Sequence, residues 1–565
     1  MTDMERFWLA QYPATTPAHV DLNEFSSLKD MIERSCTDFA HRNAFVQMGS
    51  ALSYAEIDRL SRDFAAWLLG EAGLKRGDRV AIMLPNILQY PVVLFGALRA
   101  GLTVVNTNPL YTAPELEHQL KDSGASALVV LENFAHVAQQ ILATTQVRHV
   151  VVTGTGDLLD FPKNLLVNFV LRHVRHLVPQ WHIGGALSLR EALRRGAALQ
   201  LPAVSIGHDD IAFLQYTGGT TGVAKGAMLS HGNMVANLVQ CRAWFGQVEL
   251  AEATYVCALP LYHIFSLTAN CLLFTSKGGT GLLIVNPRNF PSFVAEMRKF
   301  PPMFLMGVNT LFNALMNTAG FERVDFTRLV GTLGGGMAVQ KVVADRWLAL
   351  TGCNITQGWG LTETSPVACA NPLIGPDAAF NGSIGLPLPD TEVSIRDDAG
   401  RDVGIDASGE ICVRGPQVMQ GYWRRPDETA KVMLPDGWLR TGDIGRIDAR
   451  GFVFIEDRKK DVIVVSGFKV FPNEVEDVVA HLPGIAEVAA VGAPDERAGE
   501  AVALFVVKRD PALTEADILR HCEQSLTGYK LPRHIYFRKE LPKSNVGKIV
   551  RRELREELTR ILAKT

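Results

Sequence analysis

One glycine- and threonine-rich loop has the residue types that bind a polyphosphate. It runs from Tyr216 to Gly226 as YTGGTTGVAKG, directly after the apolar run Ile211–Leu214. Its glycines let backbone N–H groups curl toward an anion, its threonines add hydroxyl donors, and Lys225 adds a positive charge. It is not a Walker A motif, because Gly-Lys followed by Ser or Thr is absent. By itself such a turn is more often a plain hairpin.

A second segment, Gln357–Thr364 (QGWGLTET), places an aromatic ring and a carboxylate four residues apart, at Trp359 and Glu363. Further short motifs lie at Gly334–Gly336, Thr441–Asp443, Asp457–Asp461, Gly467–Glu476 and Leu541–Lys548. In this order they resemble the adenylate-forming superfamily of acyl-CoA synthetases, luciferases and peptide-synthetase adenylation domains. Details such as Leu259–Phe265 (LPLYHIF) are most similar to the bacterial long-chain fatty acid–CoA ligases. The resemblance covers essentially the whole chain.

The resemblance implies a two-step reaction that uses ATP, coenzyme A and Mg²⁺. The carboxylate of a long-chain fatty acid attacks the α-phosphate of ATP and releases pyrophosphate. The thiol of coenzyme A then cleaves the acyl adenylate, which yields acyl-CoA and AMP. The first step gathers negative charge on phosphate oxygens, so the site needs cations and oriented N–H donors.

The resemblance also assigns nucleotide-binding residues. The loop residues expected to hold the β- and γ-phosphates are Thr217, Gly218, Gly219, Thr220, Thr221, Gly222 and Lys225. Mg²⁺ prefers oxygen ligands, here Glu363 and the Thr217 hydroxyl. Trp359 would stack on adenine, where the family more often has Tyr; the family also has Ser and Pro at the places of Gly218 and Ala224. The remaining residues of the expected site are Gly335, Gly336, Gly358, Gly360 and Thr362.

Five C-terminal residues complete the expected machinery. The Asp443 carboxylate, which only accepts hydrogen bonds, suits two ribose hydroxyls, and Arg458 would contact the same ribose. Lys460 corresponds to the family's hinge. Lys548 follows a flexible glycine and would bridge the substrate carboxylate and the α-phosphate. Lys469 would either contact the adenylate or cap a strand, and both interpretations stay open.

The segment Ala253–Ser276 has no Asp, Glu, Lys or Arg over 24 residues, which is long enough to span a bilayer. Because it contains Pro260, His263 and Asn270, we expect buried core instead. A lone histidine in such a stretch is usually a core residue. In the family, however, the matching position lines the acyl pocket, and both interpretations of His263 stay open.

From Arg79 onward the sequence predicts strands and helices in alternation, and these elements must position the motifs. Short β-branched runs alternate with segments of helical period, which predicts βαβ units and a parallel sheet. Expected strands are 80–84, 103–106, 127–131 and 147–152, and a smaller α+β unit has strands at 462–465, 487–491 and 501–508. The predicted fold class is therefore α/β. We expect an adenylation domain over 1–457, a hinge at 458–460 and a mobile domain over 461–565 that carries Lys548.

Composition excludes several classes of protein. The 565 residues carry 56 Lys+Arg against 59 Asp+Glu, so no global basic field favours nucleic acid. The eight cysteines form no C-x-x-C pair, and the first residues have no apolar signal region. These features predict a cytoplasmic protein without a zinc site or disulfide framework. A homodimer is the commonest oligomer for such a protein.

Two functional alternatives stay open: an aryl-CoA ligase of the coumarate type, and a non-catalytic protein that binds fatty acid and ATP. The segment Phe161–His182 also has two interpretations. It carries Lys163, Arg172 and Arg175 among Leu, Val and Phe at helical spacing. It is either an insertion packed on the surface or a basic amphipathic helix lying on the inner face of the cell membrane. In the second case we expect Arg172 and Arg175 to face lipid together.

Overall fold

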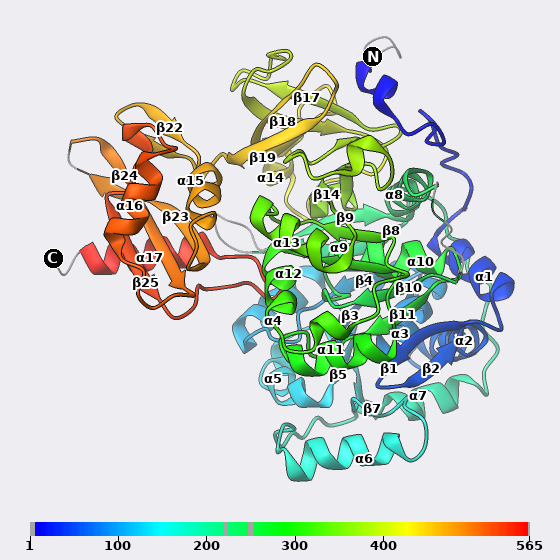
Figure 1. Cartoon of the computed structure of the whole chain (residues 1–565). Helices are drawn as coiled ribbons and strands as arrows, with labels where there is room; N and C mark the ends of the chain where they lie inside the picture. The colour runs from blue at the N-terminus through cyan, green and yellow to red at the C-terminus, as the bar shows by residue number, and fades with distance from the viewer. Residues whose placement is uncertain (1–5, 218–223, 247, 249–251, 496, 563–565) are drawn as a thin grey trace.

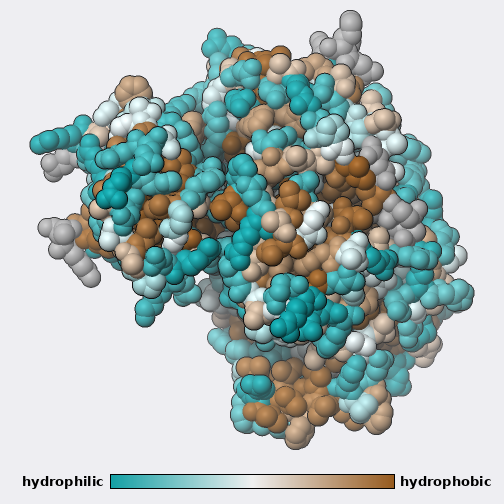
Figure 2. Space-filling model, viewed as in Figure 1, coloured by the Kyte–Doolittle hydropathy of each residue, from teal (hydrophilic) through white to brown (hydrophobic). Residues whose placement is uncertain are grey.

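The computed structural model describes residues 6–217, 224–246, 248, 252–495 and 497–562. Figure 1 shows a large body and a smaller unit beside it, which contains the C-terminal strands and helices in orange and red. In the space-filling view, hydrophilic side chains cover much of the surface, but an apolar patch lies at the end of the body where Figure 1 places helix α6, Lys163–Phe169 (Figure 2). The predicted α/β class is confirmed.

Within the described ranges, seven strands form one sheet of the body, in the order β7-β6-β5-β3-β4-β8-β9. The bounds are β3 Arg79–Met83, β4 Thr103–Asn106, β5 Ala127–Leu131, β6 His149–Thr153, β7 Leu187–Ser188, β8 Ile211–Thr217 and β9 Lys225–Ser230. All neighbours are parallel except the hairpin β8–β9. The four predicted strands agree with β3, β4, β5 and β6 within two residues, because their β-branched residues are buried.

The first sheet packs with helices whose ends the sequence marks. The helices are α2 Tyr54–Gly70, α3 Gln89–Arg99, α4 Ala113–Ser123, α5 Ala135–Gln139 and α7 Leu189–Gly196. Gly124 caps α4 at φ 63°, a left-handed conformation that glycine adopts without steric cost. At the other end of α4, Thr112 and Glu115 form a capping box. The polypeptide thus returns from each helix to the next strand at a defined residue.

The second sheet of the body, counted over the described residues, has nine strands in the order β16-β15-β14-β13-β12-β10-β11-β1-β2. The bounds are β1 Asn43–Gln47, β2 Ser50–Ser53, β10 Thr254–Cys257, β11 Thr280–Leu283, β12 Phe304–Gly307, β13 Gly331–Gly334, β14 Ile355–Gly360, β15 Val367–Ala370 and β16 Leu386–Pro387. Its helices are α1 Leu28–Asp38, α8 His231–Trp244, α11 Phe290–Lys299, α12 Asn309–Met316 and α13 Lys341–Thr351. The central strands from β1 and β11 through β14 are parallel.

The charge-free segment after β10 lies in the core, as expected. It forms three short helical pieces in succession, α9 Ile264–Ser266, the π-helical η6 Leu267–Leu272 and α10 Leu273–Thr275. Nearly all of their side chains are buried. Among the described residues, no helix is long and apolar enough to cross a membrane.

Two smaller sheets lead to the C-terminus. The antiparallel sheet β17-β18-β19-β20 has the bounds Glu392–Arg396, Gly409–Arg414, Leu439–Ile447 and Val453–Arg458, with α14 Pro426–Val432 beside it. The C-terminal unit contains β21 Ile463–Val465, β22 Phe468–Val470, β23 Ile485–Asp495, β24 Gly499–Lys508, β25 His534–Arg538, α15 Pro472–Ala480, α16 Glu515–Glu523 and α17 Arg551–Leu562. The expected α+β unit is confirmed, and β23 is longer than predicted.

The connection between body and C-terminal unit is a turn in which Lys459 and Lys460 are exposed, but the two aspartates of its charge run are buried. Asp457 is 0% and Asp461 8% exposed. Arg551 of α17 donates to Asp457 at 3.1 Å and to Glu476 at 2.9 Å. Burial raises the pKa of Glu476, while Arg551 opposes this rise. The chain therefore leaves the body through a buried ion cluster; the hinge at 458–460 stays a prediction.

This cluster predicts a large difference between two neighbouring arginines. Arg551→Met leaves buried carboxylates without a cation and should destabilise the C-terminal unit by about 3 kcal/mol. Arg552→Met is the matched control, because Arg552 is 59% exposed and pairs only loosely with Glu556, at 3.5 Å. Hydrogen–deuterium exchange at the β23 and β24 amides measures the difference, expected on the order of 100-fold. Equal exchange in both variants would contradict a stabilising role of the cluster.

Candidate functional site

A cavity of about 780 Å³ lies between the body and the C-terminal unit. Its walls include the carboxyl ends of β4, β8, β13 and β14, which is where open α/β sheets bind ligands. The C-terminal unit contributes 544–546 and Lys548 from the loop before α17. The cavity is thus closed by segments that lie far apart in the sequence.

Most of the residues expected to bind nucleotide line this cavity. They are Thr217, Lys225, His263, Gly335, Gly336, Gly358, Trp359, Gly360, Thr362, Glu363, Arg458 and Lys548. Asp443 is buried and is not part of the cavity wall, but it accepts a hydrogen bond from Trp359 and forms an ion pair with Arg458. Gly218, Gly219, Thr220, Thr221 and Gly222 lie outside the described residues. Lys460 and Lys469 are not part of the cavity wall, and Lys469 is exposed on β22.

The Asp443 carboxylate is held on both oxygens. Trp359 donates its indole N–H to Oδ2 at 2.9 Å, and Arg458 Nε lies 2.6 Å from Oδ1. Asp443 pairs with Arg458 across β19 and β20, so the strand register sets this ion pair. Burial raises the pKa of Asp443, and Arg458 opposes the rise. The indole is therefore fixed in orientation at the cavity wall.

A second cluster surrounds Glu363 and Lys225. Tyr422 donates its hydroxyl to Oε1 of Glu363 at 2.7 Å. The ammonium of Lys225 forms an ion pair with Glu428 of α14 and lies 5.2 Å from the centre of the Tyr422 ring. Hydrogen bonds from Lys225 and Lys431 lower the pKa of Glu428 to about 2. The sequence analysis missed Tyr422, Glu428 and Lys431, because only the fold brings them to the loop.

Two glycines of the expected site have a steric role. A Cβ on Gly360 would lie 1.8 Å from the carbonyl oxygen of Pro366, so glycine allows the close approach of β14 and the segment before β15. Gly336 has φ 76°, and a Cβ there would lie 2.9 Å from Cε of Lys548. Gly336 thus leaves the space that the lysine side chain occupies.

Lys548 lies on a loop that enters the cavity. Two hydrogen bonds between Ser544 and Lys548 close a tight turn in this loop. Ser544 N donates to the Lys548 carbonyl at 2.7 Å, and Lys548 N donates to Ser544 Oγ at 3.2 Å. Thr310 of the body donates to the Gly547 carbonyl at 2.8 Å, a contact between the body and the C-terminal unit. Burial and the positive charge of Arg458 lower the pKa of Lys548 to about 8.

His263 lies on the cavity wall and within electrostatic reach of Lys548. Its Nδ1 accepts the backbone N–H of Phe265 at 3.3 Å. Burial and the positive charge of Lys548 lower the pKa of His263 to about 3. The imidazole is therefore neutral at physiological pH and adds no charge to the site.

One part of the cavity is apolar, and sequence reasoning did not find its walls. Its lining residues include Cys241, Trp244, Phe245, Ile264, Phe265, Ala269, Leu273, Leu333, Val367, Ala370 and Leu388. They come from α8, the helical pieces after β10, β13, β15 and the chain after β16. Trp244 donates its N–H to the Asn371 carbonyl at 3.0 Å, so its polar atom is satisfied. No local pattern marks these residues, since each belongs to an ordinary buried face.

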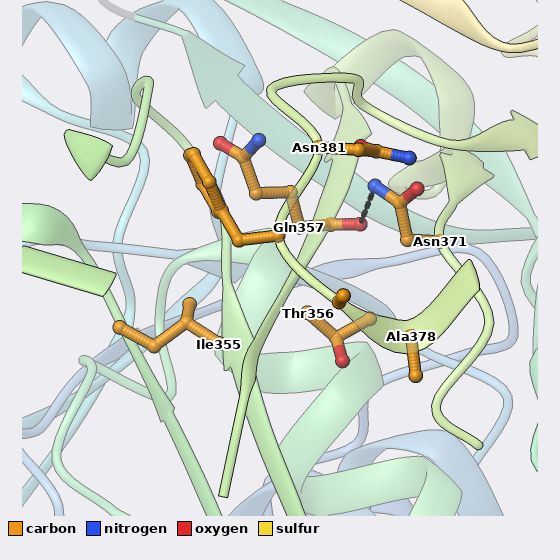
Figure 3. A pocket seen from close by; sticks show the side chains of 8 residues that line it. Ile355, Thr356, Gln357, Asn371, Ala378 and Asn381 are labelled. Atoms are coloured by element: carbon orange, nitrogen blue, oxygen red, sulfur yellow. Dashed lines mark hydrogen bonds between the residues drawn. The ribbon is translucent and has the colours of Figure 1, made fainter. Parts of the chain in front are cut away.

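A narrow crevice behind β14 has a different role. It is lined by residues such as Ile355, Gln357 and Asn371 (Figure 3), and it is too narrow to admit a water molecule. Asn371 donates to the Gln357 carbonyl at 3.4 Å, and Gln357 donates to the Ser383 carbonyl at 2.9 Å. These bonds stabilise the strand that carries Trp359 rather than a ligand.

Residues 32–423 match the AMP-binding enzyme family, and residues 474–548 match the AMP-binding enzyme C-terminal domain. The chain is 53% identical to a long-chain-fatty-acid–CoA ligase of Escherichia coli O157:H7, over 98% of both chains. It is 34% identical to a feruloyl-CoA synthase of Amycolatopsis sp, over 91% of this chain and 96% of that one. An anthranilate CoA ligase in complex with anthranoyl-AMP shares the fold, with a TM-score of 0.85, 23% identity, and coverage of 96% and 100%. The chain therefore belongs to the AMP-binding enzyme family.

The lowered pKa of Lys548 predicts a pH dependence. If the charged ammonium stabilises the phosphate transition state, kcat/KM for ATP in pyrophosphate release should fall as pH rises through about 8. Arginine stays charged over this range, so Lys548→Arg should remove the fall while lowering the maximal rate. Stopped-flow pyrophosphate release from pH 6.5 to about 9.5 measures both profiles. A wild-type profile that is flat to the alkaline limit would contradict this assignment.

Proposed function

We propose that the protein is an AMP-forming long-chain fatty acid–CoA ligase. The observation that carries the proposal is a cavity whose lining includes both an apolar part and the polar side chains of Lys548, Arg458 and Glu363, with Asp443 paired to Arg458. The high identity to relatives named long-chain-fatty-acid–CoA ligases supports the same substrate class. A long apolar chain would lie in the apolar part, with its carboxylate at the polar cluster.

In the proposed adenylation step, the chain's residues orient two anions and neutralise charge. Lys548 is charged below pH 8 and would attract both the substrate carboxylate and the α-phosphate oxygens. Asp443 and Arg458 would contact the ribose, since each Asp443 oxygen keeps a further lone pair. Trp359, fixed by Asp443, would offer a ring face to adenine. Electrostatic stabilisation by such oriented groups is usually the largest contribution to catalysis.

The residues around Glu363 fit a magnesium ion. Glu363 and Thr217 both line the cavity and offer oxygen atoms, the donors that Mg²⁺ prefers. Among the described side chains, Tyr422 is the one bonded to Glu363, at Oε1, which leaves Oε2 as a ligand. When bound, Mg²⁺ would supply positive charge to the polyphosphate. Lys225 would leave Glu428 to contact the same phosphates.

In the proposed second step, the C-terminal unit rotates about residues 458–460 and removes Lys548 from the cavity. The interface around Lys548 supports this step, because few hydrogen bonds between the described residues of the two parts cross it there. Thr310 bonds to the Gly547 carbonyl, and Asn313 donates to the Ala486 carbonyl at 3.3 Å. Both bonds are of the neutral kind, worth about 1 kcal/mol each. Coenzyme A would then enter along the surface that Lys548 leaves.

The aryl-CoA alternative shares the nucleotide residues and is therefore tested by substrate. Pyrophosphate release should be measured with straight-chain acids of increasing length and with cinnamic-type acids, with and without coenzyme A. We expect long-chain acids to exceed cinnamic-type acids in kcat/KM by about 100-fold, since each buried methylene contributes about 1–3 kcal/mol. With coenzyme A, acyl-CoA and AMP should form. A preference for cinnamic-type acids would favour the aryl-CoA alternative, and absence of turnover would favour a binding protein.

The rotation predicts that the two half-reactions depend differently on Lys548. Lys548→Ala should lower pyrophosphate release by about 10²–10³-fold, as the loss of one transition-state donor does. The same variant should convert supplied acyl adenylate and coenzyme A within about threefold of the wild-type rate. Lys543→Ala is the matched control, because Lys543 lies on the same loop but pairs with Glu487 at 2.5 Å. An equal loss of both half-reactions in Lys548→Ala would refute the rotation.

A further inference from the structure

Helix α6 (Lys163–Phe169) and its π-helical continuation η5 (Val170–Val174) present an apolar surface that nothing in the described chain covers. The α6 surface consists of Phe161, Leu165, Leu166, Phe169, Val174 and Leu177, whose exposed fractions are between 55% and 79%. Figure 2 shows this surface as an apolar patch at the end of the body. Contiguous exposed apolar patches on a protein surface commonly mark an interaction site.

The inner side of the same segment is tied to the body by polar contacts. Asn168 donates to Asp157 at 2.8 Å and accepts the Gly156 N–H at 2.7 Å. Arg172 bonds to the buried Glu132 at 2.6 and 2.9 Å. The expectation that Arg172 and Arg175 face lipid together holds less well for Arg172, whose guanidinium is paired with Glu132 of the body while 47% of its side chain stays exposed. The contacts hold the helix so that its apolar side chains stay directed to solvent.

The segment that carries the α6 surface contributes charges of one sign, although the exposed Asp160 precedes it. Residues 161–182 contain Lys163, Arg172 and Arg175 but no Asp or Glu, although acidic residues outnumber basic ones in the whole chain. Arg175 has no ion-pair partner in the part of the chain that the structure describes, and Lys163 contacts only the Met48 carbonyl, at 3.1 Å. A cationic, apolar surface is complementary to an anionic lipid surface. Two copies of it would bring like charges together, which disfavours self-association.

We propose that the α6 surface docks reversibly on an anionic lipid bilayer. The apolar side chains of Leu165, Phe169 and their neighbours enter the boundary between headgroups and acyl chains, while Lys163 and Arg175 contact anionic headgroups. Each such cation contributes modestly and is screened by salt, so the attachment is weak and salt-sensitive. The proposal concerns a surface outside the cavity and does not depend on the proposed function.

Co-sedimentation with vesicles tests the proposal. The wild-type protein should bind vesicles of phosphatidylcholine with phosphatidylglycerol at low salt, bind less at high salt, and bind weakly to phosphatidylcholine alone. Leu165→Ser/Phe169→Ser should lower the partition coefficient by at least about tenfold. Leu348→Ser/Leu350→Ser is the matched control, because these leucines are 41% and 42% exposed on α13. This control should bind as the wild type does.

A second variant, Lys163→Glu/Arg175→Glu, tests the charge contribution independently of the apolar side chains. It should lose binding to anionic vesicles at low salt. Both variants alter exposed side chains, so their thermal unfolding midpoints should equal that of the wild type. The proposal would be overturned if both variants partitioned onto vesicles as the wild type does. It would also be overturned if wild-type binding were independent of lipid charge and of salt concentration. Light scattering that finds a dimer dissociated by the first variant, without vesicle binding, would assign the surface to a second copy instead.

Discussion

The position of Lys548 is the constraint on which the site depends. An ammonium loses hydration when it enters a cavity of this kind, and the loss disfavours its charge. The fall of its pKa to about 8 reflects this loss together with the repulsion from Arg458. The Asp443 carboxylate opposes both effects, and Gly336 leaves room for the side chain. The pKa of the lysine therefore lies only slightly above neutral pH, so that the ammonium is mostly charged there. Anionic ligands in the cavity would stabilise this charge.

The contacts between the C-terminal unit and the body differ in strength from one place to another. Near the cavity, the two parts share a small number of neutral hydrogen bonds. At the junction, by contrast, Arg551 ties Asp457 of β20 to Glu476 of α15 within a buried cluster. Strong contacts thus lie close to the connecting residues, where the proposed rotation would displace atoms least. The weak contacts lie farther away, around the loop of Lys548.

Local patterns in the sequence predicted the strands of the first sheet and the capping of its helices, because burial and turn geometry act over a few residues. Sequence motifs also located most of the polar residues of the cavity. They did not reveal the bond between Trp359 and Asp443, which joins residues 84 apart in the chain. The apolar walls and the Glu428 partner of Lys225 were missed for the same reason. Helical spacing placed Arg172 on the exposed face but did not reveal its ion-pair partner Glu132, which lies 40 residues earlier in the chain.

The ion pair between Lys225 and Glu428 makes anion binding at the loop an exchange of partners. A ligand phosphate can form an ion pair with Lys225 only if it displaces the ionised carboxylate of Glu428. A single weakly charged anion therefore gains little, whereas a polyphosphate that engages several groups at once can outcompete Glu428. As pyrophosphate leaves after the proposed adenylation, Glu428 would pair with the lysine again and so assist its departure. The pair would thus act as an internal competitor that favours large polyanions on entry and promotes the release of the leaving group.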